Sequence, residues 1–117
     1  MSLKEKIFND KLYQILLEVK KRPEMFLKNA DLDLLFSFIL GYGVCEDINT
    51  IKKEIDIFDI YSDGGFDAYV HNKYKINTTH SWASIIKFYN PTKGKDLNKF
   101  YELFSEYIED CIKKNES

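Results

Sequence analysis

The side chains best suited to metal or acid–base chemistry are two histidines, His71 and His80, and two cysteines, Cys45 and Cys111. A metal or catalytic site needs three or four converging groups, and we assign neither histidine a His, Cys or carboxylate partner at ligand spacing. His80 and Ser81 are adjacent, and adjacent side chains on a helix point in different directions, so they are not expected to form a base and nucleophile. We predict structural histidines, at the surface or half-buried, and no catalytic or metal-ligating residue.

The cysteines are two isolated thiols far apart in the sequence. They match neither a disulfide framework nor a Cys-x-x-Cys metal motif, so we predict two reduced thiols at or near helix packing surfaces. The glycine pairs Gly64-Gly65 and Gly41-Tyr42-Gly43 fit no phosphate-binding loop, since the spacings of the known motifs are absent. The sequence therefore predicts no cofactor, and a protein that is not an enzyme.

Charge is distributed unevenly along the 117 residues, whose formal net charge is only -2. The stretch 30–67 has two basic residues, Lys52 and Lys53, and nine acidic ones: Asp31, Asp33, Glu46, Asp47, Glu54, Asp56, Asp59, Asp63 and Asp67. It therefore carries -7, whereas residues 1–29 carry +3 and residues 68–117 carry +2. A surface with clustered carboxylates attracts a basic partner and repels nucleic acid, although the same pattern also fits an ordinary solvated face.

From this stretch we select a candidate partner-binding set. Seven carboxylates would supply the charge, and two aromatic rings would act as buried anchors within it. The set is Glu46, Asp47, Glu54, Asp56, Asp59, Asp63 and Asp67, with Phe58 and Tyr61 as the anchors.

Hydrophobic spacing predicts the helices that position these residues. Apolar residues recur every three or four positions from Leu3 to Lys21, which predicts one helix that Pro23 ends near Arg22. Met25, Phe26 and Leu27 are too apolar for an exposed loop, so we expect this turn to fold onto the core. Asp31 or Asn29 would cap a second helix with a buried stripe formed by Leu32, Leu35, Phe36 and Ile39. Gly41 and Gly43 would end that helix or admit another backbone close to it.

The region 45–65 is ambiguous, because its isoleucines fit a helix and partly fit a strand; we favour a helix over 48–61. Ser62 to Gly65 should interrupt helical structure, and Asp63 would cap the helix that follows. The apolar face of that helix would be formed by Phe66, Tyr69, Val70 and Tyr74. A further helix, capped by Thr78 or Thr79, would bury Trp82 and end at Asn90-Pro91. The last helix would run from Asp96 to Lys113. The prediction is an all-α fold, a compact single-domain bundle of five to six helices over residues 1–117.

The N-terminus carries charges where a signal peptide needs its apolar stretch, and no apolar run approaches the roughly 20 residues of a membrane helix. We therefore expect a cytoplasmic protein that does not bind membranes.

Several pieces in a fixed order resemble a group of small bacterial immunity proteins of polymorphic toxin and contact-dependent growth inhibition systems. They are Arg22-Pro23-x-Met25-Phe26-Leu27, the apolar helix ending at Gly41-Tyr42, Phe66 to Val70, Ser81-Trp82 with Ile85-Ile86, and Phe100 to Tyr107. Many relatives have Gly and Tyr where this chain has Glu24 and Phe26. The resemblance implies a helical fold and inhibition by direct, stoichiometric binding to a cognate toxin, commonly a nuclease, and it carries over no contact residue.

Nucleases present basic surfaces, so the acidic stretch is suited to such a partner. The leading hypothesis is an immunity protein that blocks a toxin with a basic surface. The alternative is a non-catalytic helical protein-binding or self-associating regulatory module.

Overall fold

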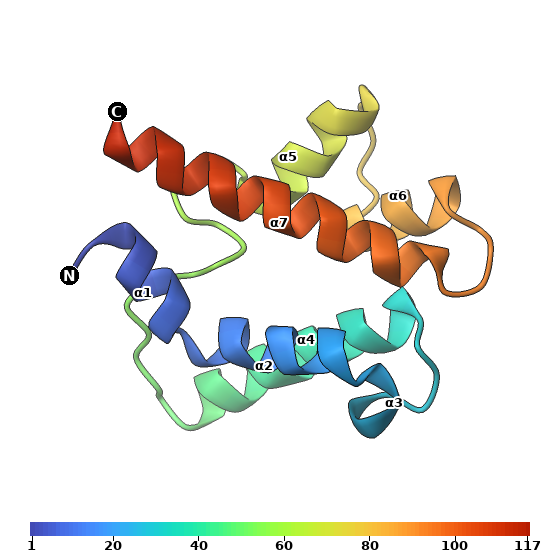
Figure 1. Ribbon diagram of the computed structural model, residues 1–117, viewed down its shortest axis with the longest axis horizontal. Coiled ribbons are helices and arrows are strands. Elements are labelled where there is room, and N and C mark those ends of the chain that lie inside the picture. The colour runs from blue at the N-terminus through green and yellow to red at the C-terminus, as the bar shows by residue number, and fades with distance from the viewer.

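Seven α-helices and no strand make up the protein in a computed structural model that describes residues 1–117. They are α1 (Leu3–Asn9), α2 (Lys11–Lys21), α3 (Pro23–Phe26), α4 (Leu32–Ile48), α5 (Gly65–Tyr74), α6 (Trp82–Tyr89) and α7 (Lys95–Glu116). The all-helical prediction is confirmed, with one helix more than the upper limit of the predicted number. The long helix α7 crosses the molecule and contacts α1, α4, α5 and α6 (Figure 1).

The N-terminal region is two helices, and the prediction of one helix from Leu3 to Lys21 is wrong. Asp10 separates them with an extended backbone (ψ 131°), and its carboxylate accepts a hydrogen bond from the Tyr13 N–H at 2.9 Å. A short acidic side chain that bonds a nearby backbone N–H favours a helix start over a helix interior. The spacing of apolar residues continues across the break, which is why periodicity alone does not reveal it.

The turn at Pro23 forms the single helical turn α3, and it folds onto the core only in part. Leu27 is buried, as predicted, whereas Met25 and Phe26 are 66% and 46% exposed. The expectation that all three apolar residues pack inward is therefore wrong for these two.

Helix α4 begins where the sequence predicts, because the Asp31 carboxylate accepts a hydrogen bond from the Leu34 N–H at 2.9 Å. The buried Asp96 side chain of α7 accepts another from the Leu32 N–H at 3.3 Å, which ties the start of α4 to α7. The helix continues through Gly41 and Gly43, and no atom lies within 4 Å of a Cβ built at either glycine. Both predicted roles for these glycines are therefore wrong.

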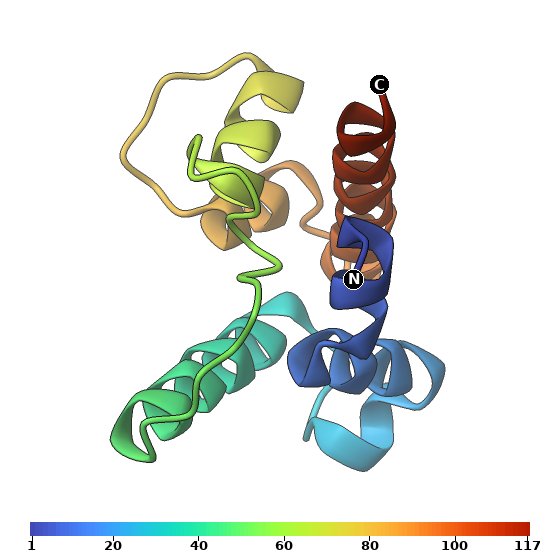
Figure 2. The same ribbon diagram turned by 90° about the vertical axis from the view of Figure 1, so that its left-hand side faces the viewer.

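The segment 49–64 forms neither a helix nor a strand between α4 and α5, so the favoured helix over 48–61 is wrong. It rises from the end of α4 to the start of α5 along the face shown in Figure 2. Ile57 is buried within it, and the Phe58 carbonyl accepts a hydrogen bond from the Phe66 N–H at 2.8 Å. Gly65 permits this approach, because a Cβ there would lie 2.0 Å from the Phe58 oxygen.

The predicted starts of α5 and α6 are close to the observed ones, but the capping residues differ. Gly64 is the N-cap of α5. The Asp63 carboxylate accepts a hydrogen bond from the Gly65 N–H at 3.1 Å. Ser81, rather than Thr78 or Thr79, caps α6 by accepting from the Ser84 N–H at 3.2 Å. Helix α6 ends at Tyr89, with Asn90 as its C-cap before Pro91, as predicted.

Aromatic rings fill the space between α5, α6 and α7. Phe66 and Phe100 are fully buried, and Trp82, which is 7% exposed, lies between them with centroids 5.0 Å and 5.2 Å away. Such ring pairs add about 0.5–1.5 kcal/mol each beyond their buried area. The prediction that Trp82 belongs to the core is confirmed, and 22 buried hydrophobic residues form one cluster. No helix has both the length and the apolar character required to cross a membrane.

Candidate partner-binding surface

Four of the predicted carboxylates lie on the last turn of α4 or in residues 49–56: Glu46, Asp47, Glu54 and Asp56. The Lys53 Nζ lies 3.4 Å from the Glu46 Oε1, and the Asp56 carboxylate accepts from the Phe58 N–H at 3.0 Å. Asp47 and Glu54 are exposed and form no ion pair. These two carry the charge that is most free to meet a partner.

Asp10, which lies outside the predicted acidic stretch, joins this group from the start of α2. Burial raises the pKa of its carboxyl, and the nearby charges of Glu46 and Asp56 raise it further. The Tyr13 N–H and Lys53 act in the opposite direction. Linear counting of charges does not reveal Asp10, because the fold alone brings α2 beside the end of α4.

Lysines also line this part of the surface. A shallow depression of about 260 Å³ has Asp10, Glu46 and Glu54 on its walls together with four lysines: Lys6, Lys11, Lys52 and Lys53. The side of the acidic group that faces α1 is therefore of mixed charge.

The other three predicted carboxylates lie farther along the chain, and two of them accept hydrogen bonds within the fold. Asp67 on α5 accepts from the Trp82 N–H at 3.0 Å, and Asp63 accepts from Gly65. One oxygen of Asp59 is buried without a hydrogen-bond partner, which is costly for a carboxylate. The structure thus brings Glu46, Glu54 and Asp56 together near Asp10, and gives Asp63 and Asp67 bonds within the chain.

The two predicted anchor rings are engaged inside the molecule. Phe58 stacks on Trp82 at a centroid distance of 5.6 Å and on Phe104 at 5.1 Å. The Tyr61 hydroxyl donates to the Cys111 carbonyl at 2.7 Å, and the Lys114 Nζ lies 4.6 Å from the centre of its ring. Contact with a partner would have to use the remaining exposed edges of these rings.

Exposed apolar side chains are instead found on α4, where the sequence reasoning did not select any residue. Leu40, Val44 and Ile48 follow one another at four-residue spacing and are 55%, 56% and 76% exposed. We call these three residues the α4 apolar row. Helical periodicity places it opposite the buried Leu35. The available signal was that α4 is apolar on all sides, which is unusual for a helix at a surface.

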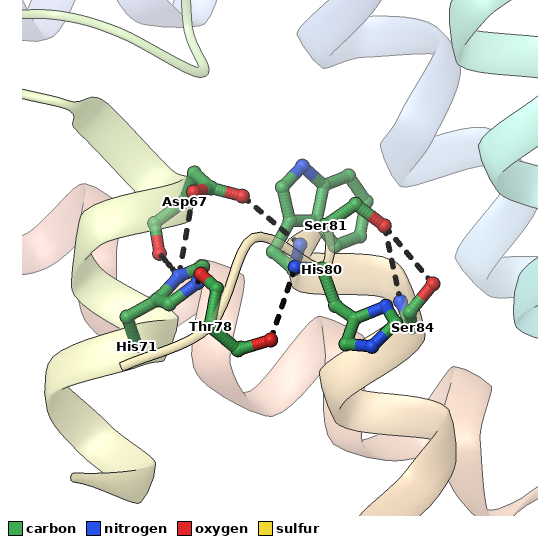
Figure 3. A network of polar contacts seen from close by, with 7 residues as sticks. Asp67, His71, Thr78, His80, Ser81 and Ser84 are labelled. Atoms are coloured by element: carbon green, nitrogen blue, oxygen red, sulfur yellow. Dashed lines mark hydrogen bonds and ion pairs between the residues drawn. The ribbon is translucent and has the colours of Figure 1, made fainter. Parts of the chain in front are cut away.

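The histidines belong to a separate polar network between α5 and α6 (Figure 3). The His71 Nδ1 lies 2.7 Å from the Asp67 carbonyl oxygen, and its Nε2 lies 3.0 Å from that of Thr78. The bond to the Asp67 carbonyl is the main cause that raises the pKa of His71. His71 is half-buried and His80 exposed, as predicted, but Asp67 is a carboxylate partner at the i,i+4 position that the sequence interpretation overlooked.

Ser81 uses its hydroxyl to cap α6 and to donate to the Ser84 Oγ at 3.2 Å. Both cysteines are free, with Cys45 exposed on α4 and Cys111 buried in α7. No group of three or more His, Cys, Asp and Glu side chains is placed to hold a metal ion. The arrangement with the clearest chemical character is therefore the exposed, acidic end of α4 with its apolar row.

Comparisons with protein-family models, with curated proteins and with solved structures give no match for this chain.

Proposed function

We propose that this protein is an immunity protein that neutralises a cognate toxin, a nuclease with a basic surface, by stoichiometric binding without chemistry of its own. The observation that carries the proposal is the charge of α4 and its surroundings. Residues 30–51 contain four acidic side chains and no Lys, Arg or His. The exposed Asp47 lies in the last turn of α4, next to Ile48 of the exposed apolar row, and the exposed Glu54 follows in the next segment.

A protein that grips nucleic acid does so with clustered Lys and Arg side chains. An acidic binding protein competes for those same side chains, and opposite charges speed the encounter of the two proteins. Inhibition by occlusion needs only a complementary surface, so the proposal requires no catalytic group on this chain.

The test is protection of bacteria that express the toxin domain encoded by the gene beside this one. We expect the double variant Asp47→Lys/Glu54→Lys to lose protection and to bind that toxin domain more slowly, with a weaker dependence on salt. The matched control is Glu24→Lys/Glu116→Lys, which makes the same change in net charge at exposed positions on α3 and at the end of α7.

Equal protection by the two double variants would contradict the acidic-surface mechanism. The proposal as a whole would be wrong if the native protein protects against no toxin encoded beside it.

A self-associating helical module is the second candidate function, and the α4 apolar row is the observation that favours it. Light scattering over a range of protein concentrations separates the two functions. A stable homodimer that binds no toxin would support the second.

A further inference from the structure

The α4 apolar row lies on the half of the helix that projects from the rest of the protein. In Figure 2 this end of α4 is at the lower left edge, with the chain that follows it alongside. From Leu40 to Ile48 the row extends about 12 Å at 1.5 Å per residue. Ile51, which is 57% exposed, follows directly after the helix. A contiguous apolar surface of this kind in a polar surround is typical of a protein-binding site.

The charged residues of α4 itself all have one sign. Asp47 lies on the same side of α4 as Leu40 and Val44 by helical periodicity, and Asp33 lies on that side two turns before the row. Asp33 is paired with Lys87 of α6, whereas Asp47 has no partner. A ligand that covers the row therefore meets an unpaired carboxylate at its edge and no lysine from α4 itself.

A second copy of the chain fits this surface poorly. Burying one Leu, Val or Ile side chain removes roughly 100 Å² from water, so three give about 300 Å² per protomer. A stable interface needs about 800 Å² per partner. Extending the contact across a two-fold axis would bring Asp47 of both copies into the same interface, where like charges repel.

We propose that the α4 apolar row is the docking site for a basic protein segment, in which apolar side chains pack on Leu40, Val44 and Ile48 while a flanking Lys or Arg side chain meets Asp47. The proposal deepens the proposed function, and rests on it, because it names the part of the same acidic surface that receives the toxin. It also replaces the partly buried rings Phe58 and Tyr61 as the source of apolar contact area.

The probe is a synthetic helical peptide of about 14 residues, with leucines along one side and lysines elsewhere. A second peptide with glutamates in place of the lysines is its control. Titration of each into the isotopically labelled protein, followed by NMR, reports both affinity and location. We expect saturable shifts of the amide signals in 37–51 with the lysine peptide, weakened by salt, and none with the glutamate peptide.

Two single variants of the protein locate the contact. Ile48→Asp removes an apolar contact and puts a charge where the leucines of the peptide would pack, so that this charge must lose its hydration on binding. Affinity for the lysine peptide should therefore fall by at least about tenfold. Phe88→Asp is the matched control, because Phe88 on α6 is also 76% exposed and the charge change is the same. Its affinity should match that of the native protein.

The inference is overturned if the lysine peptide does not bind, if its shifts lie outside α4, or if both variants weaken it equally. It is also overturned if sedimentation shows a dimer that Ile48→Asp abolishes, since a second copy would then cover the row. If the peptide results are as expected but no toxin is neutralised, the docking site stands and the proposed function fails. If Ile48→Asp still protects fully against the toxin, the docking site fails and the proposed function stands.

Discussion

Replacing Gly65 with Ala tests whether the crossing of the segment 49–64 over the start of α5 holds the fold together. Gly65 has φ +56°, and an added Cβ would lie 2.0 Å from the Phe58 oxygen and 2.7 Å from the Asp59 Cα. Ordinary contacts between heavy atoms are about 3.5–4.0 Å. Both neighbours are backbone atoms, so the side chain cannot be accommodated by a change of rotamer.

The expected cost has three parts. The left-handed backbone costs about 1–2 kcal/mol for alanine. Displacing Phe58 breaks its hydrogen bond from the Phe66 N–H, which costs about 1–3 kcal/mol when the group stays buried. Phe58 also loses its stacking on Trp82 and Phe104, at about 0.5–1.5 kcal/mol for each pair. The sum is about 3–8 kcal/mol.

Gly94→Ala is the matched control, because Gly94 has φ +82° and no atom lies within 4 Å of a Cβ built there. Only the backbone cost of about 1–2 kcal/mol applies to it. Urea unfolding of both variants, followed by circular dichroism and by Trp82 fluorescence, measures the difference. If Gly65→Ala is destabilised no more than Gly94→Ala, the close crossing is absent in solution and the reasoning is refuted.

Two further changes test the polar contacts. Both ring nitrogens of His71 face carbonyl oxygens, those of Asp67 and Thr78, so the folded state favours the charged ring and its pKa is raised above 6.5. The resulting stability is fully present below about pH 6.5 and is lost as the pH rises through the folded pKa. His71→Gln should remove this dependence in urea midpoints measured from pH 5 to 9. The same slope of midpoint against pH in the variant and the native protein would contradict this explanation. Tyr101→Phe removes the buried hydrogen bond, 2.7 Å long, that the Tyr101 hydroxyl donates to the Leu16 carbonyl. This should lower the free energy of unfolding by about 1 kcal/mol. An unchanged urea midpoint would show that this bond contributes nothing to stability.

The parts of the fold that the sequence predicts well are long helices with one apolar face. In α7 the predicted register is buried throughout: Leu97, Phe100, Phe104, Ile108 and Cys111. The end of α6 is likewise predicted, since Pro91 cannot continue a helix. These signals are local, because periodicity and proline act through residues a few positions apart.

The segment 49–64 could not be predicted in this way. Ile51, Ile55 and Phe58 have helical spacing, yet the fully buried residue is Ile57, which lies outside that register. Its position depends on the contact between Phe58 and Gly65 and on packing against α7, and neither is encoded in the spacing of its own apolar residues. Tertiary contacts override local preference here.

The candidate site shows the same division. Counting charges along the sequence finds Glu46, Glu54 and Asp56, which lie together. It also includes Asp67, whose carboxylate holds the Trp82 N–H, because a linear count cannot distinguish an exposed carboxylate from one that caps a helix.

The two halves of α4 differ in burial, so their contributions to binding and to stability can be separated by experiment. The N-terminal half carries the fully buried Leu32 and Leu35, a bond to Asp96, and the edge-to-face contact of Phe36 with Trp82 at 5.1 Å. The C-terminal half has no fully buried side chain. Ile48 is 76% exposed, so a polar residue there should cost the fold little, within about 0.5 kcal/mol in the free energy of unfolding. A loss of binding in an Ile48 variant would therefore report contact at the apolar row and not a loss of stability.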